Sequence, residues 1–379
     1  MSDAEVAPTR LSARHDRAKA RRGAARFVLT PTRHPCGVEI FTRTLADALS
    51  EPAGDYAPLA VSGRWREFPS VLGEVARSRQ VIFNFPLNAW KRMILQPLLL
   101  LLTAVFTGRR VSVFLHEWTA LHPLRRLVLA PFVILSDTIV VVSPYIADQL
   151  AKDRWFGWAQ AKCRLVPHPP TVRRPQAPRV TERVLSVARA AERYDIVIGT
   201  FGSIYKGKAS AELLDVCADL HDRGVRALLV FIGSHTRSLD DYEAEFRAAV
   251  RQRGIEDHVI VTGYVEDEGE LFALFERIGV FLFLFPEGLT ARRSSVIASL
   301  QSNRPVVVTA PQSPSEFDHH AGWTAVIASE AISFVAPGDG AAQVSDLVLA
   351  AARKAGAMPA FDGDAWWDAT TEAARAILR

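Results

Sequence analysis

Charged and hydroxyl side chains follow a predicted strand in the C-terminal part of the chain. The apolar run 280–285 predicts a buried strand, and a helix is expected over 296–302. Between the two stand the residues that could do chemistry: Pro286, Glu287, Gly288, Arg292, Arg293, Ser294 and Ser295. A helix start offers free backbone N–H groups and partial positive charge, and open α/β sheets bind ligands beyond the carboxyl ends of their strands. The segment therefore predicts a phosphate site; a serine-capped helix with solvated arginines is the alternative.

A second turn of this kind stands earlier in the chain. Residues 195–201 predict a strand, and the sequence GSIYKGK (202–208) then turns into a helix that is expected to begin near Ala209. A lysine in such a glycine-bounded turn can reach a diphosphate as a point charge. The GxxxxGK[ST] pattern of a P-loop is absent, and Lys206 taken alone is an ordinary surface lysine. Together, the two turns favour a nucleotide or another phosphorylated ligand.

The elements that must position these turns alternate between strands and helices. The predicted strands are 26–30, 57–61, 80–85, 110–115, 138–142, 196–201, 226–232, 258–262, 280–285, 305–309 and 324–328. Such alternation predicts mainly parallel sheets that are covered by helices on both faces. The fold class we expect is α/β, with two Rossmann-like, doubly wound domains facing a cleft.

The domain boundaries follow from composition. A linker rich in proline and arginine, 171–182, is expected to join an N-terminal domain (25–170) to a C-terminal domain (183–360). The first predicted strand is followed by TPTRHPCGVE rather than GxGxxG, which argues against a dinucleotide enzyme. With 379 residues, 49% hydrophobic and 23% charged, the chain has the size and composition of a two-domain globular protein.

Cysteine and histidine spacing gives no sign of a metal or redox centre. The three cysteines fit no CxxC spacing, and their odd number argues against a disulfide framework: Cys36, Cys163 and Cys217. The sequence Asp362-Gly363-Asp364 is interpreted as a turn with a helix cap rather than a metal-binding pair. We therefore expect no metal and no cofactor, and a reducing, cytoplasmic location.

Two segments could meet a membrane. Residues 1–24 form a basic tail without the apolar core of a secretory signal; the tail is expected to be disordered and attracted to anionic lipid. The apolar run 94–106 is shorter than the roughly 20 residues that span a bilayer. It is interpreted as a buried helix, with a helix in the membrane interface as the alternative. A net charge of only +4, without a nucleic-acid-binding motif, gives no reason to expect a nucleic-acid partner.

These motifs together resemble those of the GT-B glycosyltransferases, nearest to glycosyltransferase family four. The resemblance runs from about Arg26 to the end and rests on the order and spacing of segments 34–49, 111–118, 136–150, 202–208, 230–234, 259–275 and 286–309. It implies an N-terminal acceptor domain, a C-terminal nucleotide-sugar domain and a C-terminal helix (361–379) that crosses back to the first domain. It also implies transfer of a sugar, expected to be a hexose, with retention at the anomeric carbon. The acceptor implied is a glycan or a lipid-linked molecule of bacterial polysaccharide assembly.

The family's motifs assign roles to individual residues. His116 matches the strand-end histidine that faces the reacting sugar, and Glu287 resembles the first acid of the paired-glutamate motif; these are the predicted catalytic residues. Glu117, beside His116, is expected to orient the acceptor. Lys206 matches the lysine that binds the donor diphosphate. The full predicted donor set is Gly37, Gly202, Ser203, Lys206, Arg292, Arg293, Ser294 and Ser295.

The sequence departs from the family's pattern at three places. Cys36 replaces the first of two glycines, and Ser203 stands where the family has an arginine. The second acid of the motif is missing, because Ser295 or Ala298 stands there, depending on the alignment. That acid normally holds the nucleotide ribose. Contacts to the diphosphate from Arg292, Arg293 and Ser294 are therefore expected to compensate.

Two other functions fit the same residues. A sugar-nucleotide epimerase of the same architecture needs the same donor site but no acceptor. A catalytically weak, transferase-like binding subunit is favoured by the losses at Ser203 and Ser295. The partners expected for a transferase are a nucleotide-sugar, the acceptor and an anionic membrane surface. A peripheral position at the cytoplasmic face of the inner membrane is the corresponding location.

Overall fold

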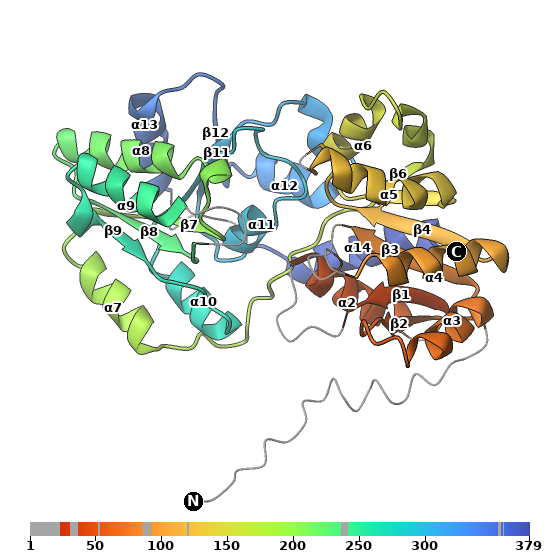
Figure 1. The fold of residues 1–379 in the computed structure, drawn as a ribbon. Helices are drawn as coiled ribbons and strands as arrows, with labels where there is room; N and C mark the ends of the chain where they lie inside the picture. The colour runs from red at the N-terminus through yellow and green to blue at the C-terminus, as the bar shows by residue number, and fades with distance from the viewer. Residues whose placement is uncertain are drawn as a thin grey trace, which may run out of the picture. The chain divides into compact units, whose positions relative to one another are not determined.

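The computed structural model describes residues 23–30, 37–51, 54–85, 90, 93–119, 121–235, 242–354, 358 and 360–379. The chain divides into two compact units (Figure 1). The first unit consists of residues up to Val166 together with Thr371–Arg379, and the second of Pro167–Thr370. The basic tail predicted over 1–24 lies outside the described residues except for its last two positions, and so does Cys36.

The first unit is built on a parallel sheet with the strand order β2-β1-β3-β4-β5-β6. Its strands are β1 (Ala25–Leu29), β2 (Tyr56–Ala60), β3 (Gln80–Phe85), β4 (Arg110–Leu115), β5 (Thr138–Val141) and β6 (Cys163–Leu165). Its helices are α2 (Gly37–Ser50), α3 (Phe68–Arg77), α4 (Leu95–Phe106), α5 (Pro123–Leu135), α6 (Pro144–Ala151) and the 3₁₀ helix η2 (Gly157–Lys162). The chain adds β2 on one side of β1 and then β3 on the other, so the direction of winding reverses between β1 and β3.

The second unit is built on a parallel sheet with the order β12-β11-β10-β7-β8-β9. Its strands are β7 (Ile196–Phe201), β8 (Ala227–Ile232), β9 (Val259–Val261), β10 (Val280–Phe283), β11 (Val306–Thr309) and β12 (Ile332–Val335). Winding reverses between β7 and β10, which are neighbours. This is the doubly wound order in which ligands bind at the reversal, beyond the carboxyl ends of the strands.

Helices cover both faces of the second sheet (Figure 1). The strand β8, sequence ALLVFI, is buried along its whole length and sends alternate side chains into two separate cores. One core lies under α8 (Ser210–Asp222), α9 (Tyr242–Gln252) and α13 (Ala341–Ala352). The other lies under α7 (Glu182–Ala191), α10 (Glu268–Phe275), α11 (Ser294–Leu300) and α12 (Ala321–Ala328). Two covered faces explain why the strands are continuous apolar runs.

The C-terminal helix α14 (Gly363–Ile377) begins in the second unit and ends in the first. In the second unit, Trp366 packs on Trp323 and Phe361. In the first unit, the carbonyl of Leu378 accepts a hydrogen bond of 3.3 Å from the hydroxyl of Tyr56. The chain thus returns to its first unit, as the resemblance implied, and the prediction of two doubly wound α/β domains is confirmed.

Two element assignments from the sequence are wrong. Residues 324–328, predicted as a strand, belong to helix α12, whose start His320 caps by accepting from the amide of Gly322. A short apolar, β-branched run does not distinguish a strand from a buried helix, and here the true strand, β12, follows at 332–335. Helix α11 begins at Ser294 rather than at Val296. Strand β6 was not predicted, because it is only three residues long.

The apolar run 94–106 forms α4 and contributes Leu100, Leu101 and Ala104 to the core of the first unit. Only the ends of this helix, at Leu95, Val105 and Phe106, are exposed. Across the described residues, we find no helix that combines the length and the apolar character needed to cross a bilayer.

Candidate functional site

The loops that follow β7 and β10 meet where the winding of the second sheet reverses. Gly202 follows β7 directly and has a φ of +119°, a value that favours glycine. The Nζ of Lys208 lies 2.7 Å from the point where a Cβ on Gly202 would stand, and the Cβ of Ser295 lies 4.0 Å from that point. The turn after β7 and the first turn of α11 therefore lie side by side.

Lys208 is the lysine that the structure places at this reversal. It ends a short 3₁₀ turn, Lys206–Lys208, and is followed by Ala209 in the left-handed conformation. Its ammonium group lies next to Arg293, and burial together with this neighbouring cation lowers the pKa of Lys208 from 10.5 to about 8. A lowered lysine pKa beside a second cation indicates a place where an anion would be bound.

Lys206, which the sequence predicted as the diphosphate lysine, points elsewhere. Its side chain is 71% exposed, and its Nζ pairs with Glu245 of α9 at 3.1 Å. The two lysines of one turn thus face different neighbours. Ser203 is exposed on the same turn.

The loop after β10 brings Glu287 to Arg292 and Arg293. The Glu287 carboxylate forms an ion pair with Arg293, and its Oε1 lies 3.6 Å from Arg292. The guanidinium of Arg293 also lies 4.2 Å from the ring centre of Phe285, a cation–π contact. All three charged side chains are largely buried.

Backbone contacts fix this loop tightly. Gly288 has a φ of +75°, and a Cβ at that position would collide with the carbonyl of Ala310. The buried carboxylate of Glu316 accepts a hydrogen bond of 2.8 Å from the amide of Ala291. The loop is therefore held on both sides by its surroundings, which is how a site is kept in one geometry.

The charges of this loop pair do not cancel. Lys208, Arg292 and Arg293 carry three positive charges, and Glu287 supplies one negative charge. The excess of two positive charges suits a diphosphate, whose oxygens prefer guanidinium and ammonium donors. Ser294 and Ser295, also predicted for the donor, are half-buried at the start of α11, beside these cations.

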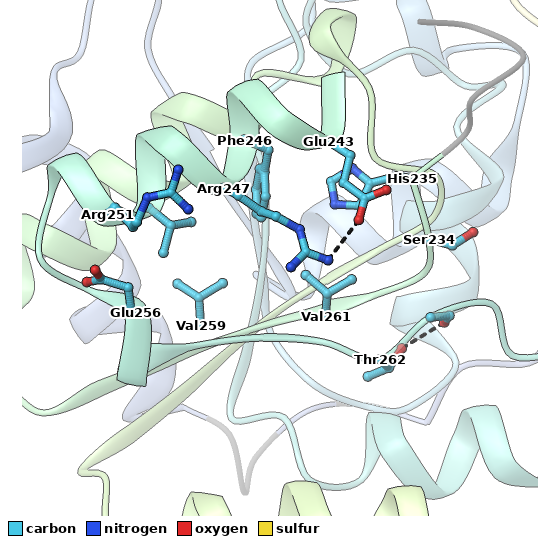
Figure 2. A pocket seen from close by; sticks show the side chains of 12 residues that line it. Ser234, His235, Glu243, Phe246, Arg247, Arg251, Glu256, Val259, Val261 and Thr262 are labelled. Carbon is cyan, nitrogen blue, oxygen red and sulfur yellow. Dashed lines mark hydrogen bonds and ion pairs between the residues drawn. The ribbon is translucent and has the colours of Figure 1, made fainter. Parts of the chain in front are cut away.

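A pocket of about 680 Å³ lies between α9 and the edge strand β9 (Figure 2). Its polar end is formed by Ser234, His235 and Thr262, at the carboxyl ends of β8 and β9. His235 forms a parallel bridge with Ile204, and the amide of Ile204 donates to the carbonyl of Ser234 at 2.9 Å. The polar end thus adjoins the turn that carries Lys206 and Lys208.

In the first unit, a buried acid ties β1 to α2. Thr30, at the end of β1, donates a hydrogen bond of 3.1 Å to Glu39, and Arg43 donates to the same carboxylate at 2.7 Å. Arg43 also donates to the Thr30 carbonyl at 2.9 Å. Gly37, predicted as a donor contact, begins α2 beside this network, and a Cβ there would have no described neighbour within 4 Å.

His116 and Asn84 meet at the ends of β4 and β3. The His116 Nε2 lies 3.4 Å from the Asn84 Oδ1, and the imidazole packs edge-on against Phe41 of α2 at 5.4 Å. Both residues are buried. Glu117 follows His116 and is half-buried. The polar groups of this unit therefore also gather at the carboxyl edge of its sheet, next to its own reversal point.

Sequence reasoning missed four residues that the structure brings to these edges: Lys208, Glu39, Arg43 and Asn84. Lys208 stands two residues after the lysine that was chosen, and spacing alone does not tell which one turns inward. Glu39 could have been found as an acid in the first turn of an otherwise apolar helix face. Asn84 could have been found as the one polar residue in the buried run QVIFNF after its first position.

The described residues contain no group of three or more His, Cys, Asp or Glu side chains that could hold a metal ion. Asp362 acts as the helix cap that the sequence predicted, because its Oδ1 accepts from the amide of Ala365 at 2.9 Å.

Comparison with known proteins agrees with this architecture. Residues 195–351 match the family model described as Glycosyl transferases group 1. No curated protein matches the chain by sequence. Among solved structures, Anabaena HepE in complex with UDP-glucose is similar over 92% of this chain and 98% of its own, with 12% identity and a TM-score of 0.59.

Two further structures have the same fold. A sucrose-phosphate synthase from Thermosynechococcus elongatus is similar over 94% of both chains, with 16% identity and a TM-score of 0.56. A glycosyltransferase from Rickettsia africae is similar over 95% of this chain and 94% of its own, with 11% identity and a TM-score of 0.56. The chain therefore has the two-domain GT-B fold, and residues 195–351 of its second unit match the model of the group 1 glycosyltransferases.

Proposed function

We propose that the protein is a retaining glycosyltransferase that moves a hexose from a nucleotide-sugar to a glycan or lipid-linked acceptor. The observation that carries this proposal is the cationic cluster at the β7/β10 reversal, inside the segment that matches the glycosyltransferase family. UDP-sugars are the first donor class to test, because the similar HepE structure was solved with UDP-glucose. Polysaccharide or glycan assembly is the process that such an acceptor implies.

The donor diphosphate is proposed to lie against Gly202, between Lys208 and the Arg292–Arg293 pair. A nucleoside diphosphate leaves with growing negative charge, and preorganised cations aimed at that charge lower the barrier. Arg293 and Lys208 are held in place before any ligand arrives, Arg293 by Glu287 and Phe285, and Lys208 by its turn. In this account they supply charge stabilisation without a metal ion. Glu287 is proposed to keep the arginines in position rather than to meet the ribose directly.

The nucleoside is proposed to extend toward the polar end of the pocket in Figure 2. Ser234 and Thr262 stand there at strand ends, next to the turn that holds the diphosphate cations. The missing second acid of the family motif would otherwise hold the ribose, so a hydroxyl group at a strand end is a chemically suitable replacement.

The first unit is proposed to take the acceptor and to face the reacting sugar with His116. The hydrogen bond to Asn84 orients the imidazole, and the packing against Phe41 limits its rotation. Glu117 and the Thr30–Glu39–Arg43 network are the polar groups available to bind acceptor hydroxyls. A lipid-linked acceptor would place the protein at the surface of a membrane.

The experiment that tests the function is a transfer assay with a panel of nucleotide-sugars. A thermal-shift screen against nucleoside diphosphates selects the base, since a ligand at 100 times its Kd stabilises the fold by about 2.7 kcal/mol. The selected sugar donor is then incubated with and without lipid-linked acceptors, and the anomeric configuration of the product is read by NMR. Transfer with retention supports the proposal. Turnover that needs no acceptor would instead indicate an epimerase, and binding without turnover a binding subunit.

A further inference from the structure

Helix α5 of the first unit is apolar on two opposite faces. Leu129, Phe132 and Val133 are buried in the core of the unit. On the other side, Leu124, Leu127, Val128 and Ile134 follow a helical spacing of three, four and seven residues and are 44–68% exposed. A surface helix normally has one apolar stripe, which faces the core. The second stripe therefore has no structural role within the described part of the unit.

Two exposed tryptophans lie on the segment that is bound along α5. Trp155 is 68% exposed and Trp158 is 52% exposed. Before them, Asp153 pairs with Arg126 of α5 at 3.4 Å. After them, Lys162 donates to the carbonyls of Ile134 at 2.9 Å and Ser136 at 2.7 Å, at the end of α5. The segment is thus attached near both ends of the helix, and its two exposed tryptophans lie beside α5.

The charges around this stripe are mainly positive, and the nearby Asp137 accepts a hydrogen bond from the amide of Val111. Residues 122–136 and 152–164 contain six arginines and lysines and a single acid, Asp153, which is already engaged by Arg126. The guanidinium of Arg154 stacks on Trp155 at 4.7 Å, and the ammonium of Lys162 on Trp158 at 4.9 Å. Indole rings that stack with cationic side chains are typical of an interface between an apolar phase and anionic groups.

We propose that the lipid-docking surface of this protein is the exposed stripe of α5 (Leu124, Leu127, Val128, Ile134) with Trp155 and Trp158, and that its partner is an anionic bilayer. Leucine and tryptophan side chains enter the interface, and the surrounding cations meet lipid phosphates. A second copy of the chain is a poorer partner, because a symmetric contact would bring the same cations together. The surface differs from the run 94–106, whose middle faces the core.

Vesicle sedimentation of the full-length protein tests this surface. Wild type is expected to pellet with phosphatidylglycerol vesicles at low salt, less at high salt, and little with phosphatidylcholine vesicles. The W155A/W158A variant should partition at least roughly tenfold less, because two large apolar side chains no longer leave water. The variant L127S should show a smaller loss in the same direction. Both variants keep the basic tail, so a loss belongs to the surface.

Matched controls come from the same unit. Trp65 is also exposed, at 55%, but lies before α3, so W65A should bind vesicles like wild type. Likewise, R125E/R154E should lose binding while R66E keeps it. Equal binding by W155A/W158A and W65A, or no pelleting of wild type with either lipid, would overturn the proposal. Self-association that W155A/W158A abolishes, without lipid binding, would assign the surface to a second copy instead.

The proposal does not depend on the transfer reaction. UDP binding measured on W155A/W158A should equal that of wild type, so a failure of the donor site and a failure of the docking surface give different results.

Discussion

At the scale of single residues, the proposed donor site depends on the directions in which two lysines of one turn point. Lys206 is exposed and pairs with Glu245, whereas Lys208 lies against Gly202 and Arg293. The left-handed Ala209 after the turn changes the direction of the chain into α8 and leaves Lys208 on the inner side. This is a property of backbone geometry that residue types alone do not carry. The β7 turn itself could be predicted, but not which of its two lysines turns toward Gly202.

The lowered pKa of Lys208 makes nucleotide binding depend on pH. Because the folded-state pKa is about 8 and the ordinary value is 10.5, the folded protein binds fewer protons between these values. This group therefore destabilises the empty protein below pH 8, and stability rises as the pH passes from about 8 to 10.5. A bound diphosphate favours the charged amine, so affinity should be highest below pH 8. Above it, Kd should rise by up to about tenfold per pH unit.

Calorimetric titration with UDP across this pH range measures the effect. The matched variant K208R keeps its charge at every pH tested, so its Kd should change little. A wild-type Kd that is flat between pH 7 and pH 9.5 would remove Lys208 from the phosphate site.

The arginine pair should distinguish a diphosphate from a nucleoside. The R292A/R293A variant should bind UDP more weakly than wild type by roughly 1.5–3 kcal/mol or more. This is the range for hydrogen bonds to charged groups. Uridine, which carries no phosphate, should bind as it does to wild type. Calorimetry with both ligands checks this, with thermal unfolding as a control because Glu287 loses its partners. Equal losses for the two ligands would mean that the arginines do not touch phosphate.

His116 is expected to act on turnover and not on donor binding. Replacing a side chain that faces the reacting sugar should lower kcat by roughly 10²–10⁴ if it takes part in proton transfer. In H116A, the Kd for UDP should stay within error of wild type, since the phosphate cations belong to the other unit. N84A, which removes the orienting partner at 3.4 Å, should show a smaller loss. Wild-type kcat in H116A would contradict the role.

At the scale of elements, two glycines allow the close packing of the proposed donor loops, and each does so for a different reason. Gly202 leaves room for the Lys208 ammonium, and Gly288 leaves room for the Ala310 carbonyl. Both glycines could be noticed in the sequence, but only the structure shows what each one avoids.

Gly288→Ala should therefore destabilise the fold more than a glycine substitution in open space. The change adds a collision with backbone to the strain of a φ of +75°, and we expect a loss of roughly 2–4 kcal/mol. Gly108, with a φ of +68° and no neighbour within 4 Å, is the matched control; Gly108→Ala should cost roughly 1–2 kcal/mol. Denaturant unfolding compares them. A smaller loss of unfolding free energy for Gly288→Ala than for Gly108→Ala would show that the loop accommodates the added methyl group at little cost.

The alternation of strands and helices could be predicted well, because both sheets are parallel and helices cover both of their faces. Runs such as 80–85, 110–115 and 196–201 are mainly apolar, since helices cover both faces of each sheet. The same continuity caused the error at 324–328, where an apolar run is a helix. The exposed apolar stripe of α5 could not be recognised, because a helix with two apolar faces has no clear period.

At the scale of the whole molecule, each unit gathers polar side chains at the carboxyl edge of its own sheet, beside the point where its winding reverses. The second unit supplies cations, and the first supplies an imidazole, carboxylates and amides. This division could be anticipated from the order of the motifs, because their order and spacing follow that of GT-B enzymes. Compensation by Arg292, Arg293 and Ser294 could also be expected from the sequence, whereas the position of Lys208 beside Gly202 could not be, since that contact forms only in three dimensions.

The central claim is that the cluster around Gly202 binds the diphosphate of a nucleotide-sugar. Calorimetric titration of UDP and of uridine into wild type, K208M and K206M tests it most directly. The account predicts that UDP binds wild type and that K208M loses roughly 10- to 150-fold in affinity for UDP but not for uridine. K206M, which removes an exposed ion pair, should stay within a fewfold of wild type. No binding of UDP or any other nucleoside diphosphate, or a larger loss in K206M than in K208M, would contradict it.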